Sequence, residues 1–146
     1  MTKKIPLIQR IGGRETLQKV HKKLYDKLFA HPWLKLYFQE SFRPQIEDQQ
    51  TDFMTNAMGG FVLFVGKPPI PTHMNMNISE QLFDIRHNYL KNAILDCGVS
   101  EDLAKEWLKI DLAFKKAICK KDVSECEKRH KNDKIMDYPN PALLNK

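Results

Sequence analysis

Residues 16–33 read TLQKVHKKLYDKLFAHPW, and the spacing of their apolar side chains decides the fold class. Leu17, Val20, Leu24 and Leu28 recur at intervals of three or four residues, which is the spacing of one face of an α-helix. Pro32 lacks a backbone N–H and marks a point at which this helix has already ended. The stretch therefore predicts an amphipathic helix of about four turns.

A second long helix is predicted at residues 46–57, after a short segment at residues 31–38 and a polar break at residues 39–44. Gly59 and Gly60 follow this helix, and glycine is suited to the residue that ends a helix. The inward face, at helical spacing, consists of Ile46, Gln50, Phe53, Met54 and Ala57.

Two serines predict the starts of two more helices. Ser79 and Ser100 can each accept a hydrogen bond from a backbone N–H of the first helical turn that follows. Gly98 ends the first of these helices, and the apolar face of the second continues to Ile118. Residues 61–72 contain one glycine and three prolines, so we expect no long regular helix there.

The remaining patterns favour a single helical domain. No run of alternating apolar and polar residues predicts a strand, so the chain is expected to be all-α. With 42% hydrophobic and 29% charged residues, the composition is that of an ordinary globular domain. We expect this domain to span residues 1–119, followed by a polar, basic extension at residues 120–146 that is at most partly helical.

Composition also argues against several classes of protein. No apolar run approaches the ~20 residues that a membrane helix needs, and no signal-type stretch follows Met1, so a cytoplasmic protein is expected. Cys97, Cys119 and Cys126 form no CxxC pair, which favours reduced thiols over disulfides or a zinc site. The formal charge of +6 comes mostly from lysines that are scattered along the chain. The basic residues near the C-terminal end have no aromatic residues among them, so we expect a solvated surface and no nucleic-acid site.

Two polar side chains lie on faces that are otherwise apolar. Gln50 falls within the inward stripe of the second helix, and Tyr25 flanks the stripe of the first. A buried amide or hydroxyl costs a few kcal/mol unless it finds a hydrogen-bond partner. Either the two residues bond each other or the backbone in an ordinary core, or they share a small polar pocket.

His73 follows the proline-containing segment and is open to two interpretations. It is either a turn residue or a metal ligand, but no HExxH motif and no acidic cluster lies near it to support a zinc or di-iron centre. Haem iron needs only one protein imidazole, because the porphyrin supplies four nitrogens and one position stays open to a gas. A single histidine is therefore sufficient for a haem site.

The glycine and aromatic pattern of residues 8–118 resembles the truncated haemoglobins, most closely their first group. Three glycine signatures occur in the family's order: Ile11-Gly12-Gly13, then Gly59-Gly60, then Gly66 seven residues before His73. Two aromatic-containing pairs follow at the family's spacing, as Leu24-Tyr25 and Tyr37-Phe38, and residues 73–83 are similar to the run after the proximal histidine. The resemblance implies a sandwich of two helices over two around a haem.

The resemblance also implies roles for individual residues. His73 would be the proximal ligand of the haem iron, and Phe38 the aromatic ring stacked on the haem. Tyr25 and Gln50 would donate hydrogen bonds to a bound oxygen, which carries partial negative charge. The other implied lining residues are Ile46, nearest the ligand, and Gln49, Phe53 and Met54, along the cavity or the haem edge.

The sequence departs from the family pattern at several places. Arg86 occupies a position that is usually apolar, so we expect either a slightly rotated helix or a contact of Arg86 with a haem propionate or solvent. Gln49 replaces the histidine or lysine that gives some relatives a second internal iron ligand, leaving His21 and His87 as further candidates for that role. Residues 126–130 do not form CxxCH, so haem b should be held noncovalently.

Three functions are compatible with these expectations. The first is reversible binding of oxygen, with nitric oxide or carbon monoxide as other ligands. The second is redox catalysis at the same haem, as a nitric oxide dioxygenase or in peroxide or nitrite chemistry, with a separate reductase. The third is a haem-free helical interaction module that uses the basic extension.

Overall fold

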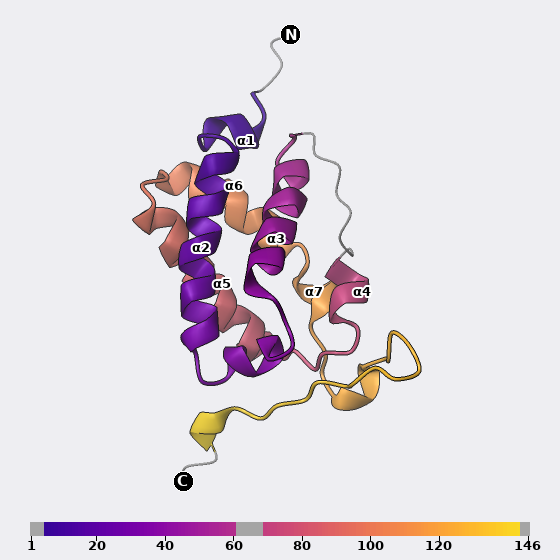
Figure 1. Cartoon of the computed structure of the whole chain (residues 1–146). Coiled ribbons are helices and arrows are strands. Elements are labelled where there is room, and N and C mark those ends of the chain that lie inside the picture. Colours follow the sequence, from indigo (N-terminus) through magenta and orange to yellow (C-terminus); the bar gives the residue numbers. More distant parts are fainter. Residues whose placement is uncertain (1–4, 61–68, 144–146) are drawn as a thin grey trace.

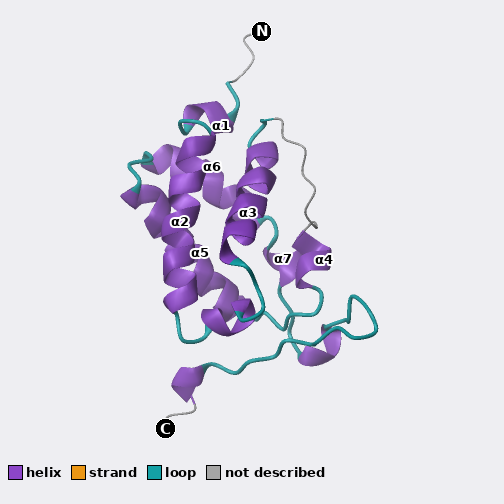
Figure 2. Cartoon of the chain, in the orientation of Figure 1, coloured by secondary structure: helices purple, strands orange, loops and turns teal. Residues whose placement is uncertain are grey.

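The computed structural model describes residues 5–60 and 69–143, which are helical throughout apart from their connections (Figures 1 and 2). Within these ranges the structure has no named strand, in agreement with the all-α prediction. The elements, in chain order, are α1 (Leu7–Arg10), α2 (Arg14–Ala30), η1 (Leu34–Phe38), α3 (Arg43–Ala57), α4 (Pro69–His73), α5 (Glu80–Asp96), α6 (Glu101–Leu112), α7 (Lys115–Ile118), η2 (Val123–Glu125) and η3 (Pro141–Leu143).

Four long helices form the body of the molecule. α2 packs against α3 on one side and α5 on another, and α5 packs in turn against α6, so that two helix pairs lie against each other (Figure 1). The stripe predicted for the first helix is buried, with Leu17, Val20 and Leu24 fully inaccessible to solvent. Trp107 of α6 is also fully buried and joins the same core. Burial of this stripe is what stabilises α2, because helix propensity alone rarely holds an isolated helix of this length.

The helix ends follow the predicted signals closely. The hydroxyls of Ser79 and Ser100 accept hydrogen bonds from the backbone N–H groups of Leu82 and Leu103. Gly59 ends the second long helix with a φ of 91°, and a Cβ at that residue would lie 3.0 Å from Cβ of Pro6. Gly66, the third glycine signature, lies outside the described residues.

One predicted helix boundary was wrong. The last helix does not run on to Ile118, because α6 ends at Leu112 and the short helix α7 begins anew at Lys115. In the segment before His73, Pro69–His73 forms a single helical turn, which the expectation of no long helix does not exclude. Proline is tolerated in a first turn, where its missing N–H would have no intrahelical partner.

The extension after residue 119 runs back across the connection between α4 and α5 (Figure 1). Backbone hydrogen bonds join the two segments, from Asn77 to Met136 and from Met136 to Asn75, each at 2.8 Å. At its far end, the indole Nε1 of Trp33 donates to the carbonyl of Tyr138 at 2.7 Å. Up to residue 143, the extension contains only the short 3-10 helices η2 and η3. The boundary predicted at residue 119 stays a prediction.

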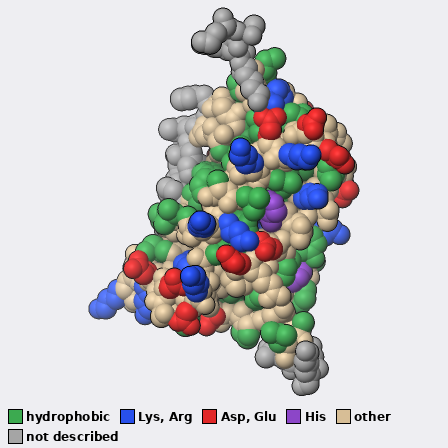
Figure 3. Space-filling model, turned by 180° about the vertical axis from the view of Figure 1, so that it is seen from behind, with side chains coloured by type: hydrophobic (Ala, Val, Ile, Leu, Met, Phe, Trp, Pro, Cys, Tyr) green, Lys and Arg blue, Asp and Glu red, His purple; other side chains and the backbone are tan. Residues whose placement is uncertain are grey.

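The surface gives no sign of a specialised basic patch on the face drawn in Figure 3, where basic and acidic side chains are interspersed. Several charged side chains of the described residues form ion pairs, as Arg43 does with Asp26. Among the described residues, no helix combines the length and the apolar character needed to cross a membrane.

Candidate functional site

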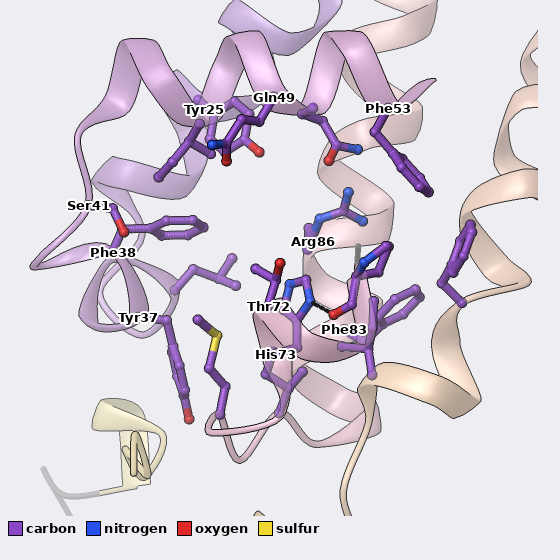
Figure 4. A pocket seen from close by; sticks show the side chains of 18 of the residues that line it. Tyr25, Tyr37, Phe38, Ser41, Gln49, Phe53, Thr72, His73, Phe83 and Arg86 are labelled. Atoms are coloured by element: carbon purple, nitrogen blue, oxygen red, sulfur yellow. Dashed lines mark hydrogen bonds between the residues drawn. The ribbon is translucent and has the colours of Figure 1, made fainter. Parts of the chain in front are cut away.

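A cavity of about 420 Å³ lies between α2, α3, the α4 turn and α5. This volume is within the range of about 300–1,000 Å³ that is typical of sites for small molecules and cofactors. Figure 4 shows Tyr25 and Gln49 on one side of the cavity and His73 on the opposite side. The eight residues predicted for the site all line this cavity: Tyr25, Phe38, Ile46, Gln49, Gln50, Phe53, Met54 and His73.

The imidazole of His73 is oriented by its own helical turn. His73 is the last residue of α4, and its Nδ1 donates a hydrogen bond to the carbonyl of Pro69 at 2.6 Å. A carbonyl can only accept, so the proton lies on Nδ1 and the lone pair on Nε2. The pKa of His73 is lowered to about 4, mainly by burial and also by the charge of nearby Arg86, although the Pro69 hydrogen bond opposes this shift. At neutral pH the imidazole is therefore neutral, which is the form that binds a metal.

Tyr25 occupies the opposite side of the cavity. Tyr25 is only 5% exposed to solvent. Its ring contacts the rings of Phe29 and Phe38 edge to face, with centroid distances of 6.2 and 6.0 Å. Burial raises the pKa of its hydroxyl to about 12, so the group stays protonated. Its hydroxyl makes no hydrogen bond to another described residue, Gln50 included, and both side chains line the cavity. Of the two sequence-based alternatives, the shared polar pocket therefore agrees with the structure.

α3 supplies the largest share of the lining through one helical face. Its lining residues follow the helical spacing of the sequence: Gln45, Ile46, Gln49, Gln50, Phe53 and Met54. The ring of Phe53 also contacts Phe114 with a centroid distance of 5.3 Å, which ties this face to the start of α7. The amides of Gln45, Gln49 and Gln50 add polar groups to this wall, and Gln49 lies on the side of Tyr25 (Figure 4).

At the cavity lies a partly buried ion pair, which sequence reasoning did not anticipate. Nη1 of Arg86 donates to both carboxylate oxygens of Asp111, at 2.9 and 3.0 Å. Nδ1 of His87 lies 2.7 Å from Oδ2 of the same carboxylate. Arg86 and His87 hold the pKa of Asp111 below its ordinary value, although burial opposes them. The available signal was one acid, Asp111, on the otherwise apolar face of α6, but nothing in the sequence paired it with Arg86.

His21 and His87 do not line the cavity. Nδ1 of His21 lies 2.8 Å from the hydroxyl of Thr51, and its ring packs edge to face with Trp107. His87 is directed to Asp111. Neither histidine is therefore placed to reach a ligand bound between His73 and Tyr25.

The donor set fits a haem better than a metal ion held by protein alone. Within residues 5–60 and 69–143, no group of three or more His, Cys, Asp or Glu side chains converges as a metal site would require. One neutral imidazole with a fixed Nδ1–H faces a cavity with largely apolar walls. A haem iron requires only one such protein ligand, and an apolar environment suits the porphyrin.

Comparison with known proteins gives the same result. A family model described as "Bacterial-like globin" matches residues 7–135. A group 1 truncated hemoglobin of Tetrahymena thermophila is 27% identical over 110 residues, which are 75% of this chain and 91% of the relative. A group 1 truncated hemoglobin of Mycolicibacterium paratuberculosis is 26% identical over 102 residues, which are 70% of this chain and 75% of the relative.

Solved structures agree with these matches. The crystal structure of the truncated hemoglobin of Tetrahymena pyriformis has a TM-score of 0.75 and 25% identity, covering 80% of this chain and 100% of that one. The 2/2 hemoglobin of a Synechococcus species has a TM-score of 0.71 and 23% identity, covering 78% of this chain and 98% of that one. Fold and site together define a haem-binding globin. The chain belongs to the bacterial-like globin family and, within it, to the truncated haemoglobins.

Proposed function

We propose that this chain holds one haem b noncovalently through His73 and binds oxygen reversibly. One observation carries the proposal: the neutral imidazole of His73 and the hydrogen-bond donors beside Tyr25 lie on opposite sides of one largely apolar cavity (Figure 4). Bound haem would supply an iron atom with one coordination position open to a diatomic gas. The protein supplies the ligand, the apolar walls and the donors.

Each group of the cavity has a defined task in this proposal. Nε2 of His73 binds the cofactor, while the Pro69 carbonyl fixes the ring through Nδ1. Phe38 and Met54 offer apolar surface to the macrocycle. Tyr25 and Gln50 donate hydrogen bonds to a polar ligand, and the protonated state of Tyr25 makes it a donor at any physiological pH.

Noncovalent attachment is supported by the cysteines. Cys97, Cys119 and Cys126 all lie outside the cavity lining, so no thiol is placed to react with a vinyl group. Extraction of the acidified protein with an organic solvent should therefore remove the haem from the polypeptide completely.

Absorption spectra of the ferric, ferrous and carbonmonoxy forms test the proposal. We expect a Soret band and a five-coordinate ferrous iron, because Ile46 cannot ligate and His21 and His87 lie outside the cavity. A protein without a Soret band after haem addition would contradict haem binding and favour a helical interaction module. Rapid mixing of the oxygenated protein with nitric oxide, followed by a turnover assay with a reductase, distinguishes a carrier from a redox enzyme.

A further inference from the structure

Arg86 brings a positive charge to a cavity whose walls are otherwise mainly apolar. It projects from α5, and Figure 4 shows its guanidinium between Tyr25 and Gln49 on one side and His73 on the other. Its side chain is only 23% exposed. An arginine does not lose its proton in a protein, so this charge is permanent.

The ion pair with Asp111 uses only part of the guanidinium. Both hydrogen bonds to the carboxylate come from Nη1, and Nε and Nη2 make no hydrogen bond to another described residue. Asp111 is in turn shared with His87. The ring of Phe83 lies 6.0 Å from the guanidinium carbon and packs against it without accepting a conventional hydrogen bond. Donors of Arg86 therefore remain for a ligand inside the cavity.

The groups around Arg86 place these donors near the position of a ligand. Tyr25 and His73 both line the cavity with Arg86. The charge of the guanidinium partly opposes the rise that burial causes in the pKa of Tyr25, and it adds to the fall that burial causes in the pKa of His73. Asp111 is the one carboxylate among the described residues that forms an ion pair with Arg86. A small molecule held between His73 and Tyr25 therefore meets a cation as well as neutral donors.

We propose that Arg86 makes the cavity a receptor for small monovalent anions, such as fluoride, azide or nitrite, at a ferric haem opposite His73. This inference rests on the proposed function. A charge-assisted hydrogen bond from a guanidinium is stronger than one from a neutral group, and the surrounding low dielectric strengthens it further. A neutral ligand such as carbon monoxide gains little from the same cation. Arg86 therefore raises the affinity for anions selectively.

Equilibrium binding to the ferric haem protein tests this selectivity. Fluoride, azide and nitrite are titrated by absorption spectroscopy, with imidazole at the ferric iron and carbon monoxide at the ferrous iron as neutral reference ligands. For Arg86→Met we expect anion affinities about tenfold lower or more, the loss of one charge-assisted hydrogen bond, while the neutral ligands change less than about threefold.

Three further variants make the test sharper. Asp111→Asn removes the countercharge and should raise anion affinity, an effect opposite in sign to that of Arg86→Met. Arg86→Lys keeps the positive charge but replaces the guanidinium with an ammonium, and it takes the place of Arg86→Met in the titrations if Arg86→Met fails to fold. Lys115→Met is the matched control, since it also removes one positive charge beside the Phe83 ring, 6.0 Å from its ammonium, but lies outside the cavity lining.

The outcomes separate this inference from the proposed function. Absence of a His73-ligated haem in the unmodified protein would overturn both. Normal haem spectra with anion affinities unchanged within about twofold in Arg86→Met and Asp111→Asn would overturn the role of Arg86 alone. Faster haem loss in Arg86→Met with unchanged anion affinity would assign the guanidinium to the haem carboxylates and overturn the anion site.

Discussion

The ammonium of Lys120 donates a hydrogen bond to the backbone carbonyl of His73 at 2.7 Å. The same ammonium bonds the carbonyls of Met76 at 2.9 Å and Ile118 at 3.0 Å. The first residue of the extension thus binds the C-terminal end of the α4 turn to the end of α7. A cation is favoured at the end of a helical segment, where carbonyls lack intrahelical partners.

Lys120→Met should loosen the segment that carries the proximal histidine. It removes three hydrogen bonds from one charged group, so we expect the free energy of unfolding to fall by about 1–2 kcal/mol and haem transfer to a scavenging protein to accelerate. Urea unfolding and the transfer rate measure the two effects. Lys121→Met, at the exposed neighbouring residue, is the control and should change neither. Equal free energies of unfolding and equal haem transfer rates in the two variants would show that the three hydrogen bonds of Lys120 do not stabilise this segment.

His73→Gly should remove the proposed bond between protein and iron. We expect weaker haem binding and an altered ferrous spectrum, both restored by added imidazole, because the deleted ring leaves room beside Pro69. Spectra and haem titrations with and without imidazole measure this. His130→Gly, at a side chain that is 62% exposed, is the matched control. An unchanged ferrous carbonmonoxy spectrum in His73→Gly would mean that another residue is the ligand.

Tyr25→Phe should accelerate the release of oxygen. The substitution removes only the hydroxyl, and a hydrogen bond to a partner carrying negative charge is worth about 1.5–3 kcal/mol, which corresponds to roughly a ten- to hundredfold faster dissociation. Stopped-flow measurement of oxygen release checks this, and carbon monoxide release should change much less.

Gln50→Leu provides a second test of the same donors. It should act in the same direction as Tyr25→Phe, and the double variant should be non-additive if the two residues form one network. Unchanged oxygen release in Tyr25→Phe, with an intact haem spectrum, would show that Tyr25 is not a donor to the ligand.

His21 should make the stability of the protein depend on pH. Burial, and secondarily the charge of Arg86, lowers the pKa of His21 to about 3, and its Nε2 has no hydrogen-bond partner. The unfolded chain takes up the proton near pH 6.5, about the ordinary pKa of histidine. The stability linked to the neutral ring is therefore fully present above that pH and is lost as the pH falls toward about 3.

This linkage predicts a slope that substitution can remove. Between pH 6 and pH 4, one such histidine contributes about 1.4 kcal/mol per pH unit to the free energy of unfolding. His21→Asn, which can still bond Thr51, should show a slope shallower by that amount in urea unfolding at several pH values. His130→Asn, at an exposed residue, should keep the original slope. Identical slopes in His21→Asn and the unmodified protein would mean that His21 is protonated in the folded state.

Much of the site was predictable because each of its parts is local in sequence. The spacing of Ile46, Gln50 and Phe53 fixes them on one face of any helix that includes them, wherever that helix lies. Ser79 and Ser100 cap their helices through a hydrogen bond that spans three residues. The turn at Pro69–His73 was missed because three prolines in this region argue against a long helix without excluding a single turn.

The sequence by itself determined the helical class, most of the helix ends, and eight of the side chains that line the cavity. Only the tertiary structure decided which distant groups meet: Arg86 with Asp111 across α5 and α6, and Lys120 with the carbonyl of His73. Helical periodicity says which face a residue occupies, but the pairing of two faces depends on how the helices cross and on where the chain returns. Both contacts are therefore fixed by packing over the whole molecule, and no local pattern contains them.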